Sequence, residues 1–342
     1  MNSALLYLDK HKMDFPSYPC SPIYSLNALS RLLGEPLDVL TRIALKSDSL
    51  YRHVPQRKKD GTPRPTYDAH EPLKKIQKKI ASRILNRIIY PQYLHGGVKD
   101  LKSPRSIYTN CAPHLGKNLI ILMDIENFYP SISREHVFSI FNKCLGFSSD
   151  VSLLLSTLLT RNNQVPQGAC TSSHLANLVF WDLESTTFSY LEENEFTYTR
   201  FADDITISTD ANKDKKQTGE AVSKVIAMLA RKGCRLKRTK FHIRRRGQAI
   251  VKDEKLTPIT VTGLSPFNKH TLAITQRERN KIRSSVKKIE IRAHAGESWK
   301  DLAPSYNRAM GRVGRLISCR HPEGDRLKRR LQMLKTYFEA AV

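Results

Sequence analysis

Acidic residues at the ends of predicted strands restrict the fold of this chain more than any other sequence feature. The run Leu119–Met123 is short and continuously apolar, which is typical of a strand buried on both faces, and Asp124 follows it directly. Asp203 and Asp204 fall at a tight turn inside Phe196–Ser208, where alternating apolar and polar residues predict two short strands. The fold is therefore expected to contain a sheet with carboxylates at its strand ends.

Three carboxylates on neighbouring strand ends suit metal ions. An Asp-Asp pair alone is more often a solvated turn, because aspartate favours turns for its own reasons. With Asp124 as the third carboxylate, the group can bind two Mg²⁺ ions about 4 Å apart, which activate an attacking hydroxyl and stabilise a leaving pyrophosphate. In a strongly basic protein, this chemistry indicates nucleotidyl transfer.

The charge of the chain indicates a polyanionic partner. Its 342 residues include 57 Lys and Arg and 32 Asp and Glu, a net charge of +25. This excess predicts attraction to nucleic acid or to an anionic membrane surface. Residues 231–342 hold 29 Lys and Arg against 9 Asp and Glu, so the last third carries +20 of the total. The apolar stretches fall well short of the ~20 residues that span a bilayer, and we expect a cytoplasmic protein with no membrane partner.

The motifs of several common enzyme classes are absent from the sequence. It has no GxGxxG, GxxxxGK[ST], HExxH or GxSxG, which argues against the commonest dinucleotide, NTPase, metalloprotease and esterase sites. The six cysteines are scattered without CxxC pairing. They indicate small buried apolar residues rather than a zinc site.

Hydrophobic periodicity and capping residues predict a mixture of helices and strands. Helices are predicted up to about Leu50 and over Pro72–Ile89, Ser133–Cys144, Ser149–Thr160, Thr171–Leu191, Lys216–Arg231, Gln276–Ala295, Asp301–Ser318 and Asp325–Ala340. Further strands are predicted near Phe241–Ile243, Ile259–Leu264 and Thr271–Ile274, and Arg52–Pro65 is predicted to be a basic, turn-rich stretch.

Two segments near the carboxylates have side chains that suit a nucleotide. Tyr129 lies five residues after Asp124, where its ring can lie under the sugar of an incoming nucleotide and clash with a 2′-hydroxyl. Core packing is the alternative for this residue. The loop Val165–Ala169 leads into a helix, so Gln167 and the backbone N–H groups can hold a nucleotide and its template base, although an ordinary turn and helix cap explains the same pattern.

These segments together resemble the palm motifs of reverse transcriptases. Asp124 within DIENFYPSI, the stretch Val165–Asn177 and FADD at Phe201–Asp204 match those motifs in order and spacing. The resemblance extends from about Arg57 to about Arg315. It implies an α+β, right-hand polymerase fold with fingers, a palm of antiparallel sheet plus helices, and a helical thumb. The expected domains are N-terminal helices and fingers at 1–117, a palm at 118–270 with part of the fingers interleaved, and a basic thumb at 271–342.

Two further segments resemble the retron reverse transcriptases of bacteria. The sequence NCAPH at Asn110–His114 precedes the first catalytic strand, and Val261, Thr262 and Gly263 resemble a Val-Thr-Gly motif linked to RNA recognition. The resemblance implies an RNA-directed DNA polymerase that uses dNTPs to copy a cognate structured non-coding RNA into a branched RNA–DNA hybrid, in anti-phage defence with an effector protein. The roles of Asn110 and His114 stay open, because a histidine near a strand start is more often structural.

The resemblance also implies roles for individual side chains. The metal carboxylates for two Mg²⁺ ions are Asp124, Asp203 and Asp204. The residues that contact the nucleotide are Arg64, which grips the triphosphate, Tyr129, which excludes ribonucleotides, Gln167, which lines the pocket, and Lys240, which protonates the leaving pyrophosphate. For Lys240, one more surface cation in a basic run is an equally good interpretation.

Two other hypotheses stay open at this point. Another bacterial reverse transcriptase, of the abortive-infection or group II intron-like kind, would share the carboxylates but would have no structured RNA gene upstream. A non-catalytic RNA-binding protein with a relict palm would tolerate substitution of Asp203. The intact Asp124, Asp203, Asp204 and Tyr129 argue against this second alternative.

Overall fold

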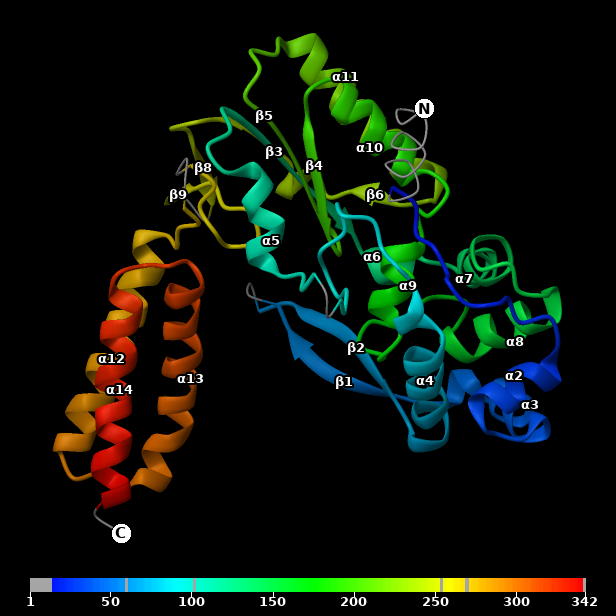
Figure 1. The fold of residues 1–342 in the computed structure, drawn as a ribbon, viewed down its shortest axis with the longest axis horizontal. Coiled ribbons are helices and arrows are strands. Elements are labelled where there is room, and N and C mark those ends of the chain that lie inside the picture. Colours follow the sequence, from blue (N-terminus) through cyan, green and yellow to red (C-terminus); the bar gives the residue numbers. More distant parts are fainter. Residues whose placement is uncertain (1–13, 59–60, 101–102, 253–254, 268–270, 341–342) are drawn as a thin grey trace, which may run out of the picture. The chain divides into compact units, whose positions relative to one another are not determined.

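The computed structural model describes residues 14–58, 61–100, 103–252, 255–267 and 271–340 (Figure 1). The chain forms two compact units. The first comprises the chain up to Arg105 with Ile121–Ile207 and Ala211–Phe241. The second comprises Ser106–Ile120, Ser208–Asp210 and the chain from His242 onward. Helices and antiparallel strands occur together, as expected for an α+β protein. The boundaries of fingers, palm and thumb stay a prediction.

A central sheet carries the acidic residues. It contains β3 (Leu119–Glu126), β4 (Thr197–Phe201), β5 (Asp204–Thr209) and β6 (Arg235–Leu236) in the order β4-β5-β3-β6, and β7 (His242–Arg245) pairs with β3. Ile120 and Ile121 have no exposed surface, which explains why the run before Asp124 is continuously apolar. The strand continues past this run to Glu126, so Asp124 lies inside the last part of the strand rather than after it.

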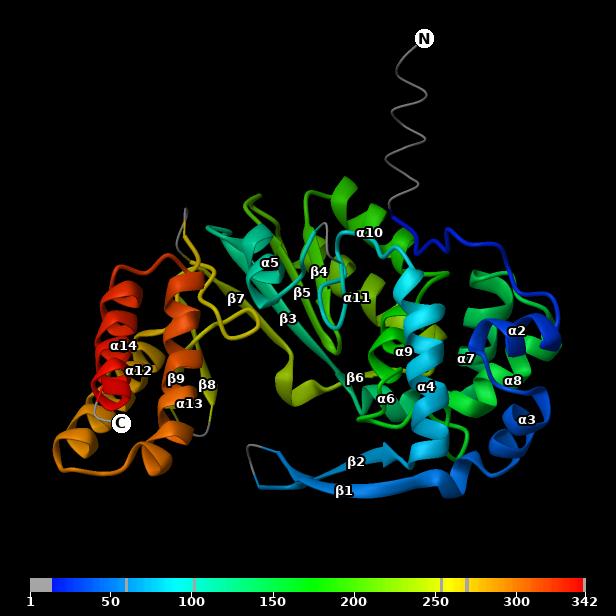
Figure 2. The ribbon, with the colours of Figure 1, turned by 60° about the horizontal axis from the view of Figure 1, so that its bottom comes forward.

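Helices of the first unit pack around this sheet and against one another. Capping residues mark some of their ends: the Ser25 and Ser148 side chains accept hydrogen bonds from the first turns of α2 (Leu26–Leu33) and α8 (Ser149–Leu159), and Gly34 ends α2 with a φ of 57°. Figures 1 and 2 show α2, α3, α7 and α8 grouped together. These helices include α2 (Leu26–Leu33), α3 (Leu37–Leu45), α4 (Glu71–Arg83), α6 (Phe128–Ser131), α7 (Arg134–Ser139), α8 (Ser149–Leu159) and α11 (Lys215–Arg231), with shorter turns at Ser47–Leu50, Leu85–Arg87, Ile140–Cys144 and Arg238–Lys240.

A two-stranded hairpin replaces the predicted turn-rich stretch after Arg52. Strands β1 (Tyr51–Arg57) and β2 (Pro63–Ala69) pair antiparallel along their whole length (Figure 2). Pro55 lies opposite Pro65 in this register. Prolines lack a backbone N–H donor and normally occur in loops or edge strands, so the sequence of this segment does not predict a pair of strands.

The predicted helix Thr171–Leu191 is two helices, α9 (Ser172–Leu178) and α10 (Glu184–Glu193). The carbonyls of Ala176 and Asn177 accept hydrogen bonds from the Arg200 guanidinium instead of from the next helical turn. The single-helix prediction is wrong because this competing donor comes from a distant strand. The break places Glu184 at the start of the second helix.

The second unit ends in three packed helices. Ile282, Val286 and Ile289 of α12 are buried, as their spacing predicts. The elements of this unit are α5 (Ile107–Cys111), a turn at Ala112–His114, β8 (Ala249–Lys252), β9 (Lys255–Pro258), α12 (Gln276–His294), α13 (Trp299–Ser318) and α14 (Glu323–Ala340). In the described chain, the strands predicted at Ile259–Leu264 and Thr271–Ile274 are reduced to isolated bridges. Positive φ angles at Thr262 and Gly263 fold the first of these segments back on itself.

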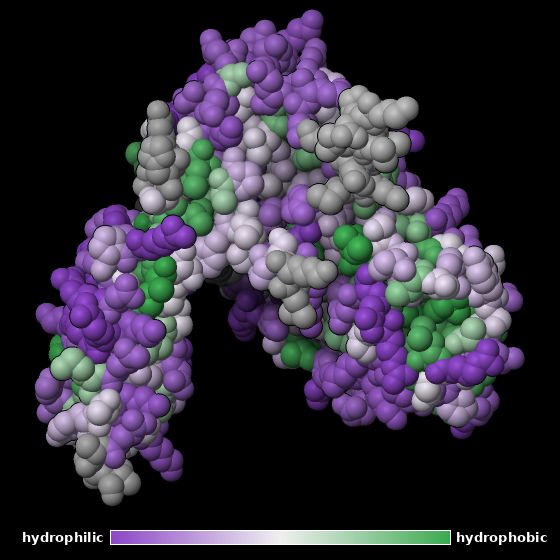
Figure 3. Space-filling model, in the orientation of Figure 1, coloured by the Kyte–Doolittle hydropathy of each residue, from purple (hydrophilic) through white to green (hydrophobic). Residues whose placement is uncertain are grey.

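The visible face of the second unit's helical bundle, α12–α14, is rich in hydrophilic residues (Figure 3). None of the helices in the described ranges combines the length and the apolar character needed to cross a bilayer.

Candidate active site

Two of the three predicted metal carboxylates lie beside each other in the first unit. Asp124, near the end of β3, is 4% exposed, and Asp203 lies in the turn between β4 and β5. The Ile125 N–H donates to the Asp203 carbonyl oxygen at 3.0 Å, which holds the turn against β3. Desolvation raises the pKa of Asp203, and the charge of Asp124 adds to this effect. The two carboxylates therefore repel each other at close range.

Lys240 supplies the counter-charge. Its ammonium donates a hydrogen bond to Asp124 Oδ2. Desolvation lowers the pKa of Lys240, but the hydrogen bond to Asp124 and the charges of Asp124, Asp204 and Asp203 outweigh it, so the net pKa is raised. Asp204, exposed at the start of β5, thus acts on the same lysine as the other two aspartates. The structure brings all four predicted residues into one electrostatic cluster.

The donor chemistry of this cluster fits a divalent cation. Carboxylate oxygens are preferred ligands of Mg²⁺, and a bound cation would relieve the repulsion that raises the pKa of Asp203. In the ranges that the structure describes, no three His, Cys, Asp or Glu side chains form a closed ligand group. Mg²⁺ commonly binds through one or two carboxylates, substrate phosphates and water, so an open carboxylate pair fits this ion.

A pocket of about 250 Å³ lies in the same unit. It is lined by Tyr129 and Gln167, two of the predicted nucleotide contacts, together with Gln56 and Thr66 of the hairpin and Ser172 and Ser173 of α9. Desolvation and the charge of Asp203 raise the pKa of the Tyr129 phenol, whereas Arg64 lowers it. The tyrosine therefore lies within electrostatic reach of the acidic cluster.

Arg64 lies on β2 directly opposite Gln56, which lines the pocket. Its charge acts on both Asp203 and Tyr129. An exposed arginine in this position has a planar set of N–H donors that match phosphate oxygens. The hairpin thus brings Arg64 to the acidic cluster and the pocket.

Hydrogen bonds fix the pocket loop to the hairpin and to α9. The Tyr67 N–H donates to the Gln167 carbonyl oxygen at 2.8 Å, and the Ser172 hydroxyl donates to the Pro166 carbonyl oxygen at 2.6 Å. Gly168 has a φ of 109°, and a Cβ there would lie 2.9 Å from the Tyr67 carbonyl oxygen. Only glycine allows this close approach, so the loop that presents Gln167 has a defined position.

The two retron-like segments meet in the second unit. The Thr262 hydroxyl donates to the Ile107 carbonyl oxygen at 3.1 Å, and Asn110 Nδ2 donates to Thr262 Oγ1 at 3.5 Å. Asn110 and Val261 are fully buried, whereas Gly263 is exposed with a φ of 83°. An RNA at this turn would therefore meet Gly263 and the backbone, and the buried Val261 side chain is not presented to it.

His114 has a structural position. It has no exposed surface, and its Nδ1 lies 2.7 Å from the Ser208 hydroxyl in a hydrogen bond. Nearby, the Gly116 N–H donates to the Pro266 carbonyl oxygen at 2.7 Å. These contacts join the segment before β3 to β5 and to the chain that follows the Val-Thr-Gly turn.

Sequence reasoning missed the glycine pair Gly96 and Gly97. A Cβ on Gly96 would lie 2.5 Å from the Ala202 nitrogen, and one on Gly97 would lie 2.8 Å from the Ser173 Cβ. The pair therefore fits between the β4–β5 turn and α9, where no side chain has room. The adjacent glycines were the available signal, and their partners are distant in the sequence. Gln56 and Thr66 were missed because the hairpin was not predicted.

A carboxylate pair on a sheet, a paired lysine and a pocket in the same unit are the features expected of a nucleotidyl-transferring polymerase. In agreement, residues 56–275 match the family described as reverse transcriptase (RNA-dependent DNA polymerase). The chain is 32% identical over 329 residues to the retron Se72 reverse transcriptase of Salmonella heidelberg, covering 96% of this chain and 84% of that protein. It is 28% identical over 346 residues to the retron Ec48 reverse transcriptase of Escherichia coli, covering 98% and 81%. The chain belongs to the retron reverse transcriptases and is an RNA-directed DNA polymerase.

Proposed function

We propose that this polymerase copies a cognate structured non-coding RNA into a branched RNA–DNA hybrid, in the bacterial cytoplasm and in anti-phage defence with an effector protein. The observation that best supports the polymerase chemistry is the Asp124–Asp203 pair. Lys240 is hydrogen-bonded to Asp124, and the pair lies in the same unit as the pocket lined by Tyr129 and Gln167. The retron relatives, which match over most of their length, support the RNA partner.

In the proposed reaction, an RNA hydroxyl attacks the α-phosphate of a dNTP in line, the hydroxyl proton passes to water, and pyrophosphate leaves. Asp124, Asp203 and Asp204 would hold two Mg²⁺ ions, which would make the hydroxyl more acidic and neutralise phosphate charge. Arg64 binds the triphosphate. Lys240 keeps its proton because of the surrounding carboxylates and donates it to the leaving pyrophosphate.

The branch distinguishes this function from that of other reverse transcriptases. The protein is purified with its co-expressed upstream RNA and supplied with Mg²⁺ and labelled dNTPs. We expect a product that survives protease and stays joined to RNA through a ribonuclease-resistant 2′ branch. Incorporation only from an added 3′-hydroxyl primer would support the polymerase activity but contradict the assignment of a cognate RNA. No incorporation from either primer would contradict the site assignment and favour an RNA-binding role.

Tyr129→Ala is expected to admit ribonucleotides. Removing the ring opens the pocket where the 2′-hydroxyl would lie, so selectivity for dNTP over NTP should fall by about 100-fold, because one steric contact commonly supplies discrimination of that size. Single-nucleotide incorporation with matched dNTP and NTP pairs measures the ratio. Tyr24→Ala removes an exposed tyrosine, 71% accessible, from the same unit and serves as the control. Unchanged selectivity in Tyr129→Ala would exclude the gating role.

We also propose that the α12–α14 bundle is the thumb that holds the template–primer duplex, within a division into fingers (1–117), palm (118–270) and thumb (271–342). A hollow of about 520 Å³ on this bundle is lined by Arg277, Lys281 and Lys288 of α12 and Arg312 of α13. Such a concentration of cations suits phosphate oxygens, and it requires no base contact.

Replacing Arg277, Lys281 and Lys288 together by glutamine is expected to weaken duplex binding uniformly across sequences. The slope of log affinity against log salt is negative, and it should become shallower by about one for each phosphate that the variant no longer neutralises. Titration of a labelled RNA–DNA duplex at several salt concentrations measures this slope. The matched control replaces Lys215, Lys216 and Arg231, exposed on α11, in the same way. An equally large change of this slope in both triple variants would contradict a specific role for the bundle.

A further inference from the structure

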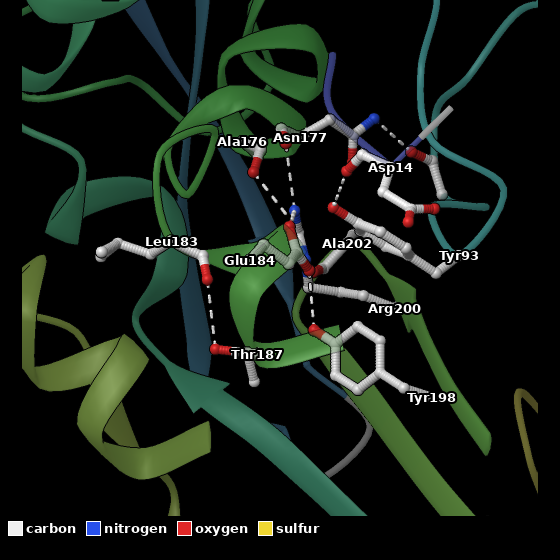
Figure 4. Close-up of polar contacts among 11 residues, drawn as sticks. Asp14, Tyr93, Ala176, Asn177, Leu183, Glu184, Thr187, Tyr198, Arg200 and Ala202 are labelled. Carbon is white, nitrogen blue, oxygen red and sulfur yellow. Dashed lines mark hydrogen bonds and ion pairs between the residues drawn. The ribbon is translucent and has the colours of Figure 1, made fainter. Parts of the chain in front are cut away.

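The first unit buries an ion pair just before the Asp203 turn. Arg200 has no exposed surface and Glu184 is 2% exposed. Arg200 Nε and Nη2 donate to the two Glu184 carboxylate oxygens at 2.5 and 2.6 Å, and the Tyr198 hydroxyl donates to the same carboxylate at 2.7 Å (Figure 4). The pair is therefore bidentate and fully desolvated.

The other Arg200 donors reach backbone carbonyls on both sides of the pair. Nη1 donates to Ala176 O at 3.1 Å and to Ala202 O at 3.3 Å, and Nη2 donates to Asn177 O at 3.0 Å. All five guanidinium N–H groups thus have an acceptor. Ala176 and Asn177 lie near the end of α9, and Ala202 directly precedes Asp203. One side chain joins the aspartate turn to α9 and α10 (Figure 4).

The Ala202 backbone is in a conformation that needs support. Its φ is 55°, in the left-handed region that alanine rarely adopts. Arg200 holds its carbonyl, and Gly96 packs against its nitrogen. Gly96 is in turn held by Asn177, whose Nδ2 donates to the Gly96 carbonyl at 2.7 Å. Both sides of Ala202 are therefore tied to the same helix, α9.

Stability alone does not explain this arrangement. A buried ion pair is often no more stabilising than apolar residues of similar volume, because both charges lose their hydration. What an arginine offers and an apolar side chain lacks is a rigid, planar set of donors that fixes several acceptors at once. Phe128 and Phe180 lie against the guanidinium, with ring centroids 6.0 and 5.3 Å from its central carbon, and limit its movement.

We infer that Arg200 is a positioning residue for polymerisation: it fixes Asp203 relative to the pocket by tying Ala202 to the end of α9. The opposite end of α9 supplies Ser172 and Ser173 to the pocket wall. All five N–H groups of Arg200 already have protein acceptors, so it acts through Ala202 and not by contact with nucleotide or metal. The inference rests on the proposed roles of Asp203 and the pocket.

The test compares Arg200→Lys with Tyr198→Phe, using the full chain with its RNA. Lysine keeps the charge but cannot fix the same acceptors, so kcat per folded molecule should fall by about 100-fold with little change in the KM for dNTP. The Mg²⁺ concentration for half-maximal activity should rise. Tyr198→Phe removes a hydrogen bond from Glu184 without touching the turn, so it should lower Tm by about 2–4 °C and leave kcat unchanged.

A second variant tests the inference in case Arg200→Lys does not fold. The triple substitution Glu184→Leu, Tyr198→Phe and Arg200→Met replaces the buried polar group by apolar residues, which typically preserves folding. A folded but slow triple variant supports the inference, and a folded variant with wild-type kcat overturns it. Asp203→Asn is measured in parallel. If it equals wild type, the site assignment and this inference both fail. If it is inactive while Arg200→Lys keeps wild-type kcat, only this inference fails.

Discussion

Asp203→Asn is expected to abolish dNTP incorporation, with a loss of at least about 1000-fold, or roughly 4 kcal/mol of transition-state stabilisation. Asparagine has nearly the same shape but carries no charge, so it cannot hold a divalent cation beside Asp124 in the same way. Because Asp203 is already partly desolvated and repelled by Asp124, the substitution removes strain from the apoprotein. Activity should therefore fall without loss of folding.

The measurement is single-turnover incorporation at saturating dNTP and Mg²⁺, together with a thermal unfolding curve. Asp38→Asn is the matched control, because it makes the same chemical change at a side chain that is 73% exposed and pairs with Arg42 on α3. We expect wild-type rates for this variant. Residual Asp203→Asn activity within about tenfold of wild type would show that this carboxylate is not a metal ligand.

The parts of the structure that sequence predicts well are those set by local pattern. The apolar run before Asp124 identifies a doubly buried strand because hydrophobic burial on both faces leaves no alternation. The three C-terminal helices follow from the spacing of residues such as Ile282, Val286 and Ile289. The acidic cluster was predictable because Asp124 follows the apolar run and Asp203 and Asp204 fall at a turn between two predicted strands, which puts all three at neighbouring strand ends.

The missed parts depend on contacts between distant segments. The break between α9 and α10 comes from Arg200, more than twenty residues away, whose guanidinium donates hydrogen bonds to the carbonyl oxygens of Ala176 and Asn177. The β1–β2 hairpin contains facing prolines and mostly exposed residues, so neither propensity nor alternation indicates it. The lining of the pocket by Gln56 could not be predicted without that hairpin.

Two buried histidines next to the site should make the folded protein sensitive to acid. His95 and His174 are 8% and 4% exposed, and burial, assisted by nearby Arg105 and Lys99, lowers the pKa of each to about 4. The unfolded chain binds these protons near pH 6.5. Above about pH 6.5 both histidines are neutral in the folded and in the unfolded chain, so folding is not opposed. As the pH falls towards about 4, the unfolded chain binds these protons first, and the free energy of unfolding falls by roughly 3 kcal/mol for His174.

His174→Asn separates this effect from general acid denaturation. Asparagine can still accept the hydrogen bond that joins the Tyr90 hydroxyl to His174 Nδ1 at 3.1 Å, but it does not titrate. Between pH 6 and pH 5, the free energy of unfolding from urea titration should fall less steeply in the variant, by up to about 1.4 kcal/mol per pH unit. His53→Asn, at an exposed position of β1, should follow the wild-type profile. Parallel profiles for wild type and His174→Asn would mean that His174 binds its proton equally in both states, contrary to its burial on α9.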